Sequence, residues 1–173
     1  MIRLAAPADL DAIEESYREH FTYEKNHIAY TVFQEGVYPT RGVAEQALHR
    51  NALYVYEENG IVLGSLILDG RQPAEYKKIN WPSQAAVEQT MVIHLLLVRP
   101  CAKGKGIGSQ LVTYAVETAR QRACTAVRLD TGAQNTPAVS LYQRHGFQLA
   151  AATAMNVGGA IPHKDHLFFE KIV

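Results

Sequence analysis

The sequence predicts a single domain of mixed α/β class (mixed α+β) over residues 1–173. We expect a twisted central mixed sheet of about six to seven strands, flanked by about four helices. Hydrophobic residues make up 47% of the chain and charged residues 20%, a balance typical of globular domains. Helical and extended apolar patterns alternate along the chain. Near its centre, a buried strand, a loop, a helix and another strand follow one another, which favours a right-handed parallel crossover.

The N-terminal half predicts three strands and two helices. Pro7 and Asp9 mark the start of the first helix, whose apolar face extends to Phe21. Thr40 is a suitable N-cap for a second helix that ends near His49. The predicted strands are residues 2–5, 53–57 and 61–69, and an Asn-Gly pair at residues 59–60 predicts a hairpin between the last two.

The C-terminal half predicts four strands and two helices. The predicted helices run from about residue 106 to 122 and from Pro137 to Gly146, where glycine is typical just past a helix end. The predicted strands are residues 90–98, 125–130, 147–155 and 166–172. The long connection 70–89 contains the only tryptophan, Trp81, and connections of this length often have a function.

Composition narrows the classes of partner. Lys+Arg and Asp+Glu number 17 each, so the chain carries no overall charge that would favour nucleic acid. The longest apolar stretch, residues 91–98, is too short to span a bilayer and is interrupted by His94. Two cysteines do not suggest a disulfide framework, and the N-terminus does not resemble a signal peptide. We expect a cytoplasmic protein with no nucleic-acid or membrane partner.

A glycine-rich loop lies between the predicted strand 90–98 and the helix that follows it. Its glycines permit sharp turns and close approach to a ligand, and the free amides of the helix start attract anions. We therefore expect a phosphate or pyrophosphate site, the alternative being a structural turn with two solvated lysines. The P-loop and dinucleotide-binding patterns are both absent. The loop residues are Lys103, Gly104, Lys105, Gly106, Ile107, Gly108 and Ser109.

Two segments resemble the core of the GNAT family of N-acetyltransferases, which corresponds to residues 90–149 here. The first is VIHLLLVRPCAKGKGIGSQLVTYAVETA, in which Lys103 takes the place of the family's Gln or Arg before Gly106-Ile107-Gly108. The second is AVRLDTGAQNTPAVSLYQRHGF, which matches the family's Asn-x-x-Ala-x-x-Leu-Tyr pattern from Asn135 to Tyr142. The resemblance implies the GNAT fold for the whole chain.

The resemblance also implies an activity. The chain would be an N-acetyltransferase that uses acetyl-CoA as acyl donor, without a metal, and a primary amine as acceptor. The amine would attack directly in a ternary complex, because neither cysteine lies in a recognisable nucleophile arrangement. A non-catalytic acyl-CoA-binding or sensor domain, a nucleotide-binding protein and a different acyl group are the alternatives.

By the same resemblance, Tyr142 is the acid that donates a proton to the departing thiolate, although it is also a reasonable core residue. The backbone of Leu96, Leu97 and Val98 would bind the pantetheine arm, and the glycine loop the pyrophosphate. Asn135 would contact the cofactor, cap the following helix, or do both.

The general base and the acceptor site are less defined. His94 matches the second histidine of the His-x-His in serotonin N-acetyltransferase, with Val92 at the first position; a core histidine is the alternative. Acceptor contacts are expected from tyrosine-rich and tryptophan-containing segments, with Tyr30, Tyr38 and Trp81 as candidates. The acceptor itself is a small-molecule amine or a peptide or protein amine, and a homodimer is neither required nor excluded.

Two further histidines, His163 and His166, lie close to the C-terminus. On a regular strand their spacing predicts side chains on opposite faces, so we expect no metal site there. The family's last strands flank the acceptor pocket, which would bring these residues near it.

Overall fold

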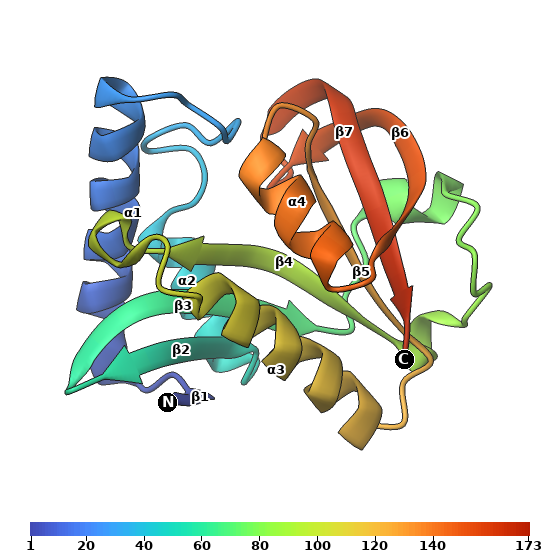
Figure 1. Ribbon diagram of the computed structural model, residues 1–173, viewed down its shortest axis with the longest axis horizontal. Helices are drawn as coiled ribbons and strands as arrows, with labels where there is room; N and C mark the ends of the chain where they lie inside the picture. Colours follow the sequence, from blue (N-terminus) through green and yellow to red (C-terminus); the bar gives the residue numbers. More distant parts are fainter.

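The computed structural model describes all 173 residues and contains one seven-stranded mixed sheet with helices on both faces (Figure 1). The sheet order is β1-β2-β3-β4-β5-β7-β6, and only β4 and β5 are parallel. The predicted number and order of strands and helices are confirmed. The strands are β1 Ile2–Leu4, β2 Leu53–Glu58, β3 Ile61–Asp69, β4 Thr90–Val98, β5 Ala126–Gly132, β6 Gln148–Val157 and β7 Ile161–Ile172.

The helices lie where the periodicity predicts them. They are α1 Leu10–Asn26, α2 Arg41–His49, α3 Ile107–Gln121 and α4 Thr136–Arg144, with short 3-10 turns η1 Pro7–Asp9, η2 Ala74–Lys78, η3 Val87–Gln89 and η4 Pro100–Ala102. Asn59 and Gly60 both have positive φ, as the predicted two-residue hairpin turn requires. No helix is both long and apolar enough to cross a membrane.

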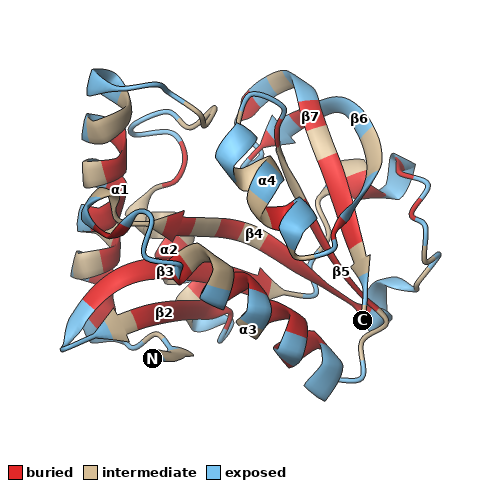
Figure 2. Cartoon of the chain, viewed as in Figure 1, coloured by how far each residue is buried: buried red, intermediate tan, exposed pale blue.

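Two apolar layers enclose the sheet. In Figure 1, α3 and α4 lie in front of it, and α2 lies behind. The front layer joins α3 to β3, β4 and β5 through residues such as Leu111 and Leu129, whereas the rear layer joins α1 and α2 to β2, β3 and β4. Figure 2 shows buried residues concentrated on the central strands and on the inward sides of the helices.

β4 and β5 separate part of the way along their length. They pair from Thr90–Ala126 to Ile93–Leu129, but β4 continues to Val98 without this partner. The pairing of β4 with β3 shifts at the same point, because Ile67 faces Leu95 and Leu68 faces Ile93, so that His94 is an extra residue. Such a bulge bends a strand. The two strands therefore form a V whose opening exposes one backbone edge of β4.

A second irregularity brings two histidines together. Thr153 pairs with His166 and Met155 with His163, so a three-residue step on β7 faces a two-residue step on β6. This extra residue cancels the alternation of side chains. The Nδ1 atoms of His163 and His166 lie 3.0 Å apart, and the prediction of opposite faces is wrong.

Candidate active site

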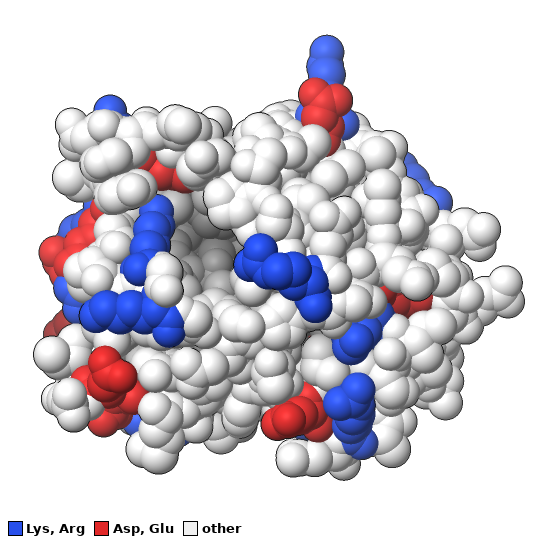
Figure 3. Space-filling view, viewed as in Figure 1, with Lys and Arg blue, Asp and Glu red and all other residues white.

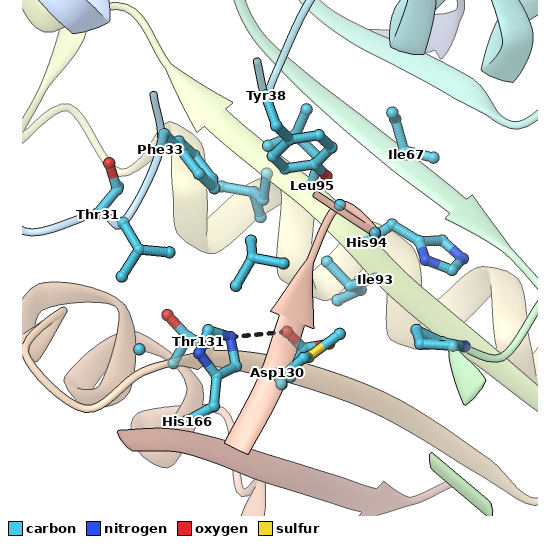
Figure 4. Close-up of a pocket in the computed structure, with 18 of the residues that line it drawn as sticks. Thr31, Phe33, Tyr38, Ile67, Ile93, His94, Leu95, Asp130, Thr131 and His166 are labelled. Carbon is cyan, nitrogen blue, oxygen red and sulfur yellow. Dashed lines mark hydrogen bonds and ion pairs between the residues drawn. The ribbon is translucent and has the colours of Figure 1, made fainter. Parts of the chain in front are cut away.

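A cavity of about 590 Å³ lies where β4 and β5 separate. Its walls come from β3, β4, β5 and α4, together with the segment 31–38, the start of the β3–β4 connection and the β6–β7 turn. Figure 4 shows side chains from these distant parts of the chain pointing into one space. The lining also includes residues of α2, which lies behind the sheet, whereas α4 lies in front of it, so ligands can approach the cavity from opposite sides.

The glycine loop continues from the exposed edge of β4. Gly104 and Gly106 have φ of +78° and +76°, and nothing lies within 4 Å of a Cβ placed on either. Gly106 is the N-cap of α3, so its amide and the three that follow have no acceptor within the helix. Figure 3 shows a hollow on this face with Lys and Arg side chains beside it. The loop thus has the free amides and the open space that a pyrophosphate needs.

Lys103 and Ser109 already have partners. Lys103 Nζ lies 3.7 Å from the centre of the Tyr23 ring, and burial lowers the pKa of this lysine although Glu24 opposes the effect. Ser109 Oγ lies 2.7 Å from His145 Nε2. The Ser109 hydroxyl is therefore engaged between α3 and α4, and its free amide is the group available to an anion.

The three predicted pantetheine contacts lie on the unpaired part of β4. On their other side Leu96, Leu97 and Val98 pair with β3, and no strand covers the side that faces the V. Leu96 also lines the cavity. An extended chain with amide groups can pair with this edge as an added strand would.

Tyr142 approaches the cavity from α4. Its side chain is buried against Phe147 and lines the cavity, while its hydroxyl makes no hydrogen bond to the protein. Burial, reinforced by the negative charge of Asp130, raises the pKa of this phenol well above its usual value. Tyr142 consequently keeps its proton at neutral pH and has it available for a ligand.

Asn135 fulfils one of its two expected roles directly. Its Oδ1 accepts a hydrogen bond from the amide of Ala138 at 3.4 Å, which caps α4. The residue also lines the cavity, so the NH2 group of its side-chain amide remains available there as a hydrogen-bond donor. The capping role is confirmed, and the cofactor contact stays a prediction.

His94 lies at the bulge of β4 and lines the cavity. Its Nε2 is 2.7 Å from Asp69 Oδ1. Burial would raise the pKa of Asp69, but the hydrogen bond and charge of His94, the amide of Arg71 and the side chain of Arg50 together lower it to about 2. The ionised Asp69 can only accept, so Nε2 carries the proton and Nδ1 has a free lone pair.

Asp130 and His166 form a second acid–histidine pair, which the sequence analysis missed. Asp130 is the first residue of β5 beyond its pairing with β4. Its carboxylate accepts from the Tyr76 hydroxyl at 2.7 Å, and its other oxygen lies 3.0 Å from His166 Nε2. Figure 4 shows this pair on one side of the cavity and His94 on the other. The available signal was an acidic residue at the carboxyl end of a parallel strand, where ligands often bind.

Of the three predicted acceptor residues, only Tyr38 lines the cavity. It is buried, and a side chain at Gly158 in the β6–β7 turn would collide with its ring. Tyr30 lies outside the lining. Trp81 is buried in a separate cluster with Tyr76, and its indole donates to the Tyr76 carbonyl at 3.0 Å. The structure thus places Trp81 in the packing of the β3–β4 connection and away from the cavity.

No group of three or more His, Cys, Asp or Glu residues in the structure is arranged to hold a metal ion. The site instead combines a glycine loop with free amides, an unpaired strand edge, a protonated phenol and two acid–histidine pairs.

Comparison with known proteins agrees with this arrangement. The model of the acetyltransferase (GNAT) family matches residues 10–147. An N-acetyltransferase of Methanocaldococcus jannaschii is 32% identical over 98 residues, which cover 57% of this chain and 39% of that protein. The streptothricin acetyltransferase of Streptomyces lavendulae is 30% identical over 50% of this chain and 46% of its own. The chain thus spans less than half the length of these curated relatives.

Solved structures are similar over the whole chain. An N-acetyltransferase of Staphylococcus aureus is 28% identical, with a TM-score of 0.71, and the similarity covers 99% of this chain and 97% of that one. A GNAT-family acetyltransferase of Streptococcus agalactiae has a TM-score of 0.82 at 18% identity, covering 100% and 95%. A Salmonella typhimurium structure with acetyl-CoA has a TM-score of 0.71 at 21% identity, covering 99% and 92%. The last two support the fold alone.

Proposed function

Because the chain belongs to the acetyltransferase (GNAT) family, we propose that it transfers the acetyl group of acetyl-CoA to a primary amine by direct attack in a ternary complex. The observation that carries the proposal is the V between β4 and β5. It joins the free amides of the glycine loop and the edge of β4 to a cavity lined by Tyr142, His94 and the Asp130–His166 pair.

The residues present fit acetyl-CoA. The amides that begin α3, with Lys105 nearby, would hold the pyrophosphate, and the backbone of Leu96 to Val98 would pair with the pantetheine arm. Bound there, acetyl-CoA supplies an activated acyl group as a thioester. An amide of the same β4 segment can donate to an oxygen that becomes negative during attack.

Tyr142 would act as the acid. It lines the cavity with an unpaired hydroxyl, and burial keeps the phenol protonated. The phenol keeps its proton while charge develops on the departing sulfur, so Oη can stabilise the thiolate by donating a hydrogen bond to it.

His94 would act as the base. A protonated amine cannot attack, so one proton must leave the acceptor first. His94 Nδ1 has a free lone pair, and Asp69 fixes the ring through Nε2 and stabilises the imidazolium that forms. The proposed transfer is therefore from the ammonium nitrogen to His94 Nδ1, directly or through water.

We also propose a cellular compartment and a class of partner. Cys101 and Cys124 are both free thiols, which fits a reducing cytoplasm. The acceptor would be a small-molecule amine or a peptide or protein amine, without nucleic acid or membrane. A homodimer remains compatible with these features.

The test is thiol release from acetyl-CoA in the presence of a panel of primary amines, with acetylated products identified by mass spectrometry. Thiol release that depends on an amine and yields an N-acetyl product supports the proposal. The alternative, a non-catalytic acyl-CoA sensor, predicts that acetyl-CoA binds while no amine in the panel increases thiol release.

A further inference from the structure

The proposed acceptor side of the cavity contains a half-buried carboxylate without a permanent cation. The side chain of Asp130 is 14% exposed and forms an ion pair only with a histidine, His166. Its charge raises the pKa of both Tyr142 and Tyr38, although burial is the larger cause in each case. A buried carboxylate is costly unless a cation approaches it. An acceptor amine enters as an ammonium ion and can provide that cation close to Tyr142.

Two arginines line the other end of the cavity. Arg71 is exposed in the β3–β4 connection, and only its backbone amide is hydrogen-bonded, to Asp69. Arg50, just after α2, is 3.3 Å from Asp69 and also donates to the carbonyl of Gln46. Asp69 is already shared with His94. Asp69 thus pairs with Arg50 and His94, and the carboxylate of Glu75, which also lines the cavity, accepts from the amide of Asn156. The guanidinium group of Arg71 has no carboxylate partner and is free to bind an anion.

The strand register gives the separation of the two ends. Asp69 pairs with Val92, Val92 pairs with Arg128, and Asp130 lies two residues further along β5. Two strand spacings and two residues of rise place the Cα atoms of Asp69 and Asp130 about 12 Å apart. Arg71 follows two residues after Asp69. A ligand that contacts both ends therefore needs a spacer between its two charged groups.

Four apolar side chains lie along the wall between the two ends, which His94 interrupts. Ile67, Ile93 and Leu95 line it from the strands, and Phe33 lines it from the segment 31–38 (Figure 4). A hydrocarbon spacer can be buried against these side chains, whereas a spacer with polar groups would lose hydrogen bonds to water.

From these observations we infer the class of acceptor, an inference that rests on the function proposed above. The acceptor is a small primary amine that carries an anionic group several bonds away, joined by a mainly apolar spacer. Its ammonium group binds beside Asp130, and the proton that it loses before attack reaches His94 Nδ1, on the other side of the cavity, through water. Its carboxylate, phosphate or similar anion binds Arg71 with support from Arg50. Guanidinium groups suit such anions because they donate two parallel hydrogen bonds.

The inference is tested by equilibrium binding to the protein saturated with CoA, which requires no turnover. The probes are glycine, γ-aminobutyrate, 6-aminohexanoate and 6-aminohexanamide, the uncharged counterpart of the third. We expect 6-aminohexanoate to bind at least tenfold more tightly than its amide and more tightly than glycine. Equal binding of the acid and the amide overturns the inference.

Single substitutions show which side chain binds each charged group of the probe. Arg71→Gln should weaken 6-aminohexanoate at least tenfold and leave 6-aminohexanamide within twofold, whereas Asp130→Asn should weaken both. Arg120→Gln is the matched control, because Arg120 is an exposed arginine on α3 outside the cavity lining. An Arg71→Gln variant that binds the acid as the wild type does overturns the inference. Failure of the proposed function would give a different result: the protein would bind CoA, but no amine would increase thiol release from acetyl-CoA.

Discussion

At the scale of single residues, Tyr142 is the proposed acid of the reaction. It lines the cavity, lies within the field of Asp130, and keeps an unpaired hydroxyl. Asn135, which begins the same helix, has a second role as a cap and would disturb α4 when replaced. Tyr142 is therefore the cleaner position at which to test catalysis.

The substitution Tyr142→Phe removes one hydroxyl and keeps the ring packed on Phe147. We expect kcat to fall at least tenfold while the Kd of acetyl-CoA changes less than twofold, because the hydroxyl acts only on the departing sulfur. Steady-state kinetics and calorimetric titration measure the two quantities. Unchanged turnover would remove Tyr142 from the role of acid.

His94 predicts a pH dependence. Protonation of the ring occupies the lone pair of Nδ1, so kcat/KM should fall on the acidic side of its pH profile if His94 is the base. Asp69, with a pKa of about 2, is ionised throughout the range from pH 5 to 9 and contributes no step there. His94→Gln should lower the rate and abolish the acidic limb. A pH–rate profile that keeps its shape in this variant excludes His94 as the base.

At the scale of elements, the strand and helix order followed from local patterns, because apolar periodicity and turn residues depend on near neighbours. The two β-bulges did not follow from local patterns. His94 and the step between His163 and His166 depend on the pairing of β4 and β7 with partner strands. Local patterns therefore predict a regular strand around His94 and opposite faces for two histidines that are in contact.

The glycine loop allows a controlled test at this scale. Gly106 and Gly36 have φ of +76° and +78°, and both have open space around an added Cβ. Replacing either by alanine should reduce the free energy of unfolding by about 1 kcal/mol, since the left-handed conformation disfavours side chains. Only Gly106→Ala should also weaken CoA binding, by about tenfold, because its methyl group occupies the anion site. Equal Kd values for the two variants would contradict the assignment of the loop.

At the scale of the whole molecule, the site joins residues that are distant in sequence. The motifs around residues 103–109 and 135–142 were recognisable because each is contiguous. The acidic partners of the histidines were not recognisable, because Asp69 lies 25 positions from His94 and Asp130 lies 36 positions from His166. Distance in sequence also explains why Trp81 was assigned to the acceptor site, because its neighbours in the fold include Phe168 of β7.

Trp81 should consequently behave as a core residue. It is 7% exposed and packs with Tyr76 and Phe168 beneath the connection that carries Arg71. We expect Trp81→Ala to lower the free energy of unfolding by about 3–5 kcal/mol. Trp81→Phe should retain most of the stability and leave the KM for the acceptor within twofold, as urea unfolding and steady-state kinetics would show. A large rise in KM in a stable Trp81→Phe protein would return this residue to the acceptor site.

The central claim is that the V and its glycine loop form an acetyl-CoA site, and a thermal-shift comparison of acetyl-CoA, CoA, ATP and NAD tests it most directly. A ligand at a hundredfold its Kd adds about 2.7 kcal/mol to the stability of the folded protein. For a chain of this length, Tm should rise by roughly 5 to 11 °C. We predict this rise with acetyl-CoA and CoA only. No rise with either, or a comparable rise with ATP or NAD alone, would contradict the account.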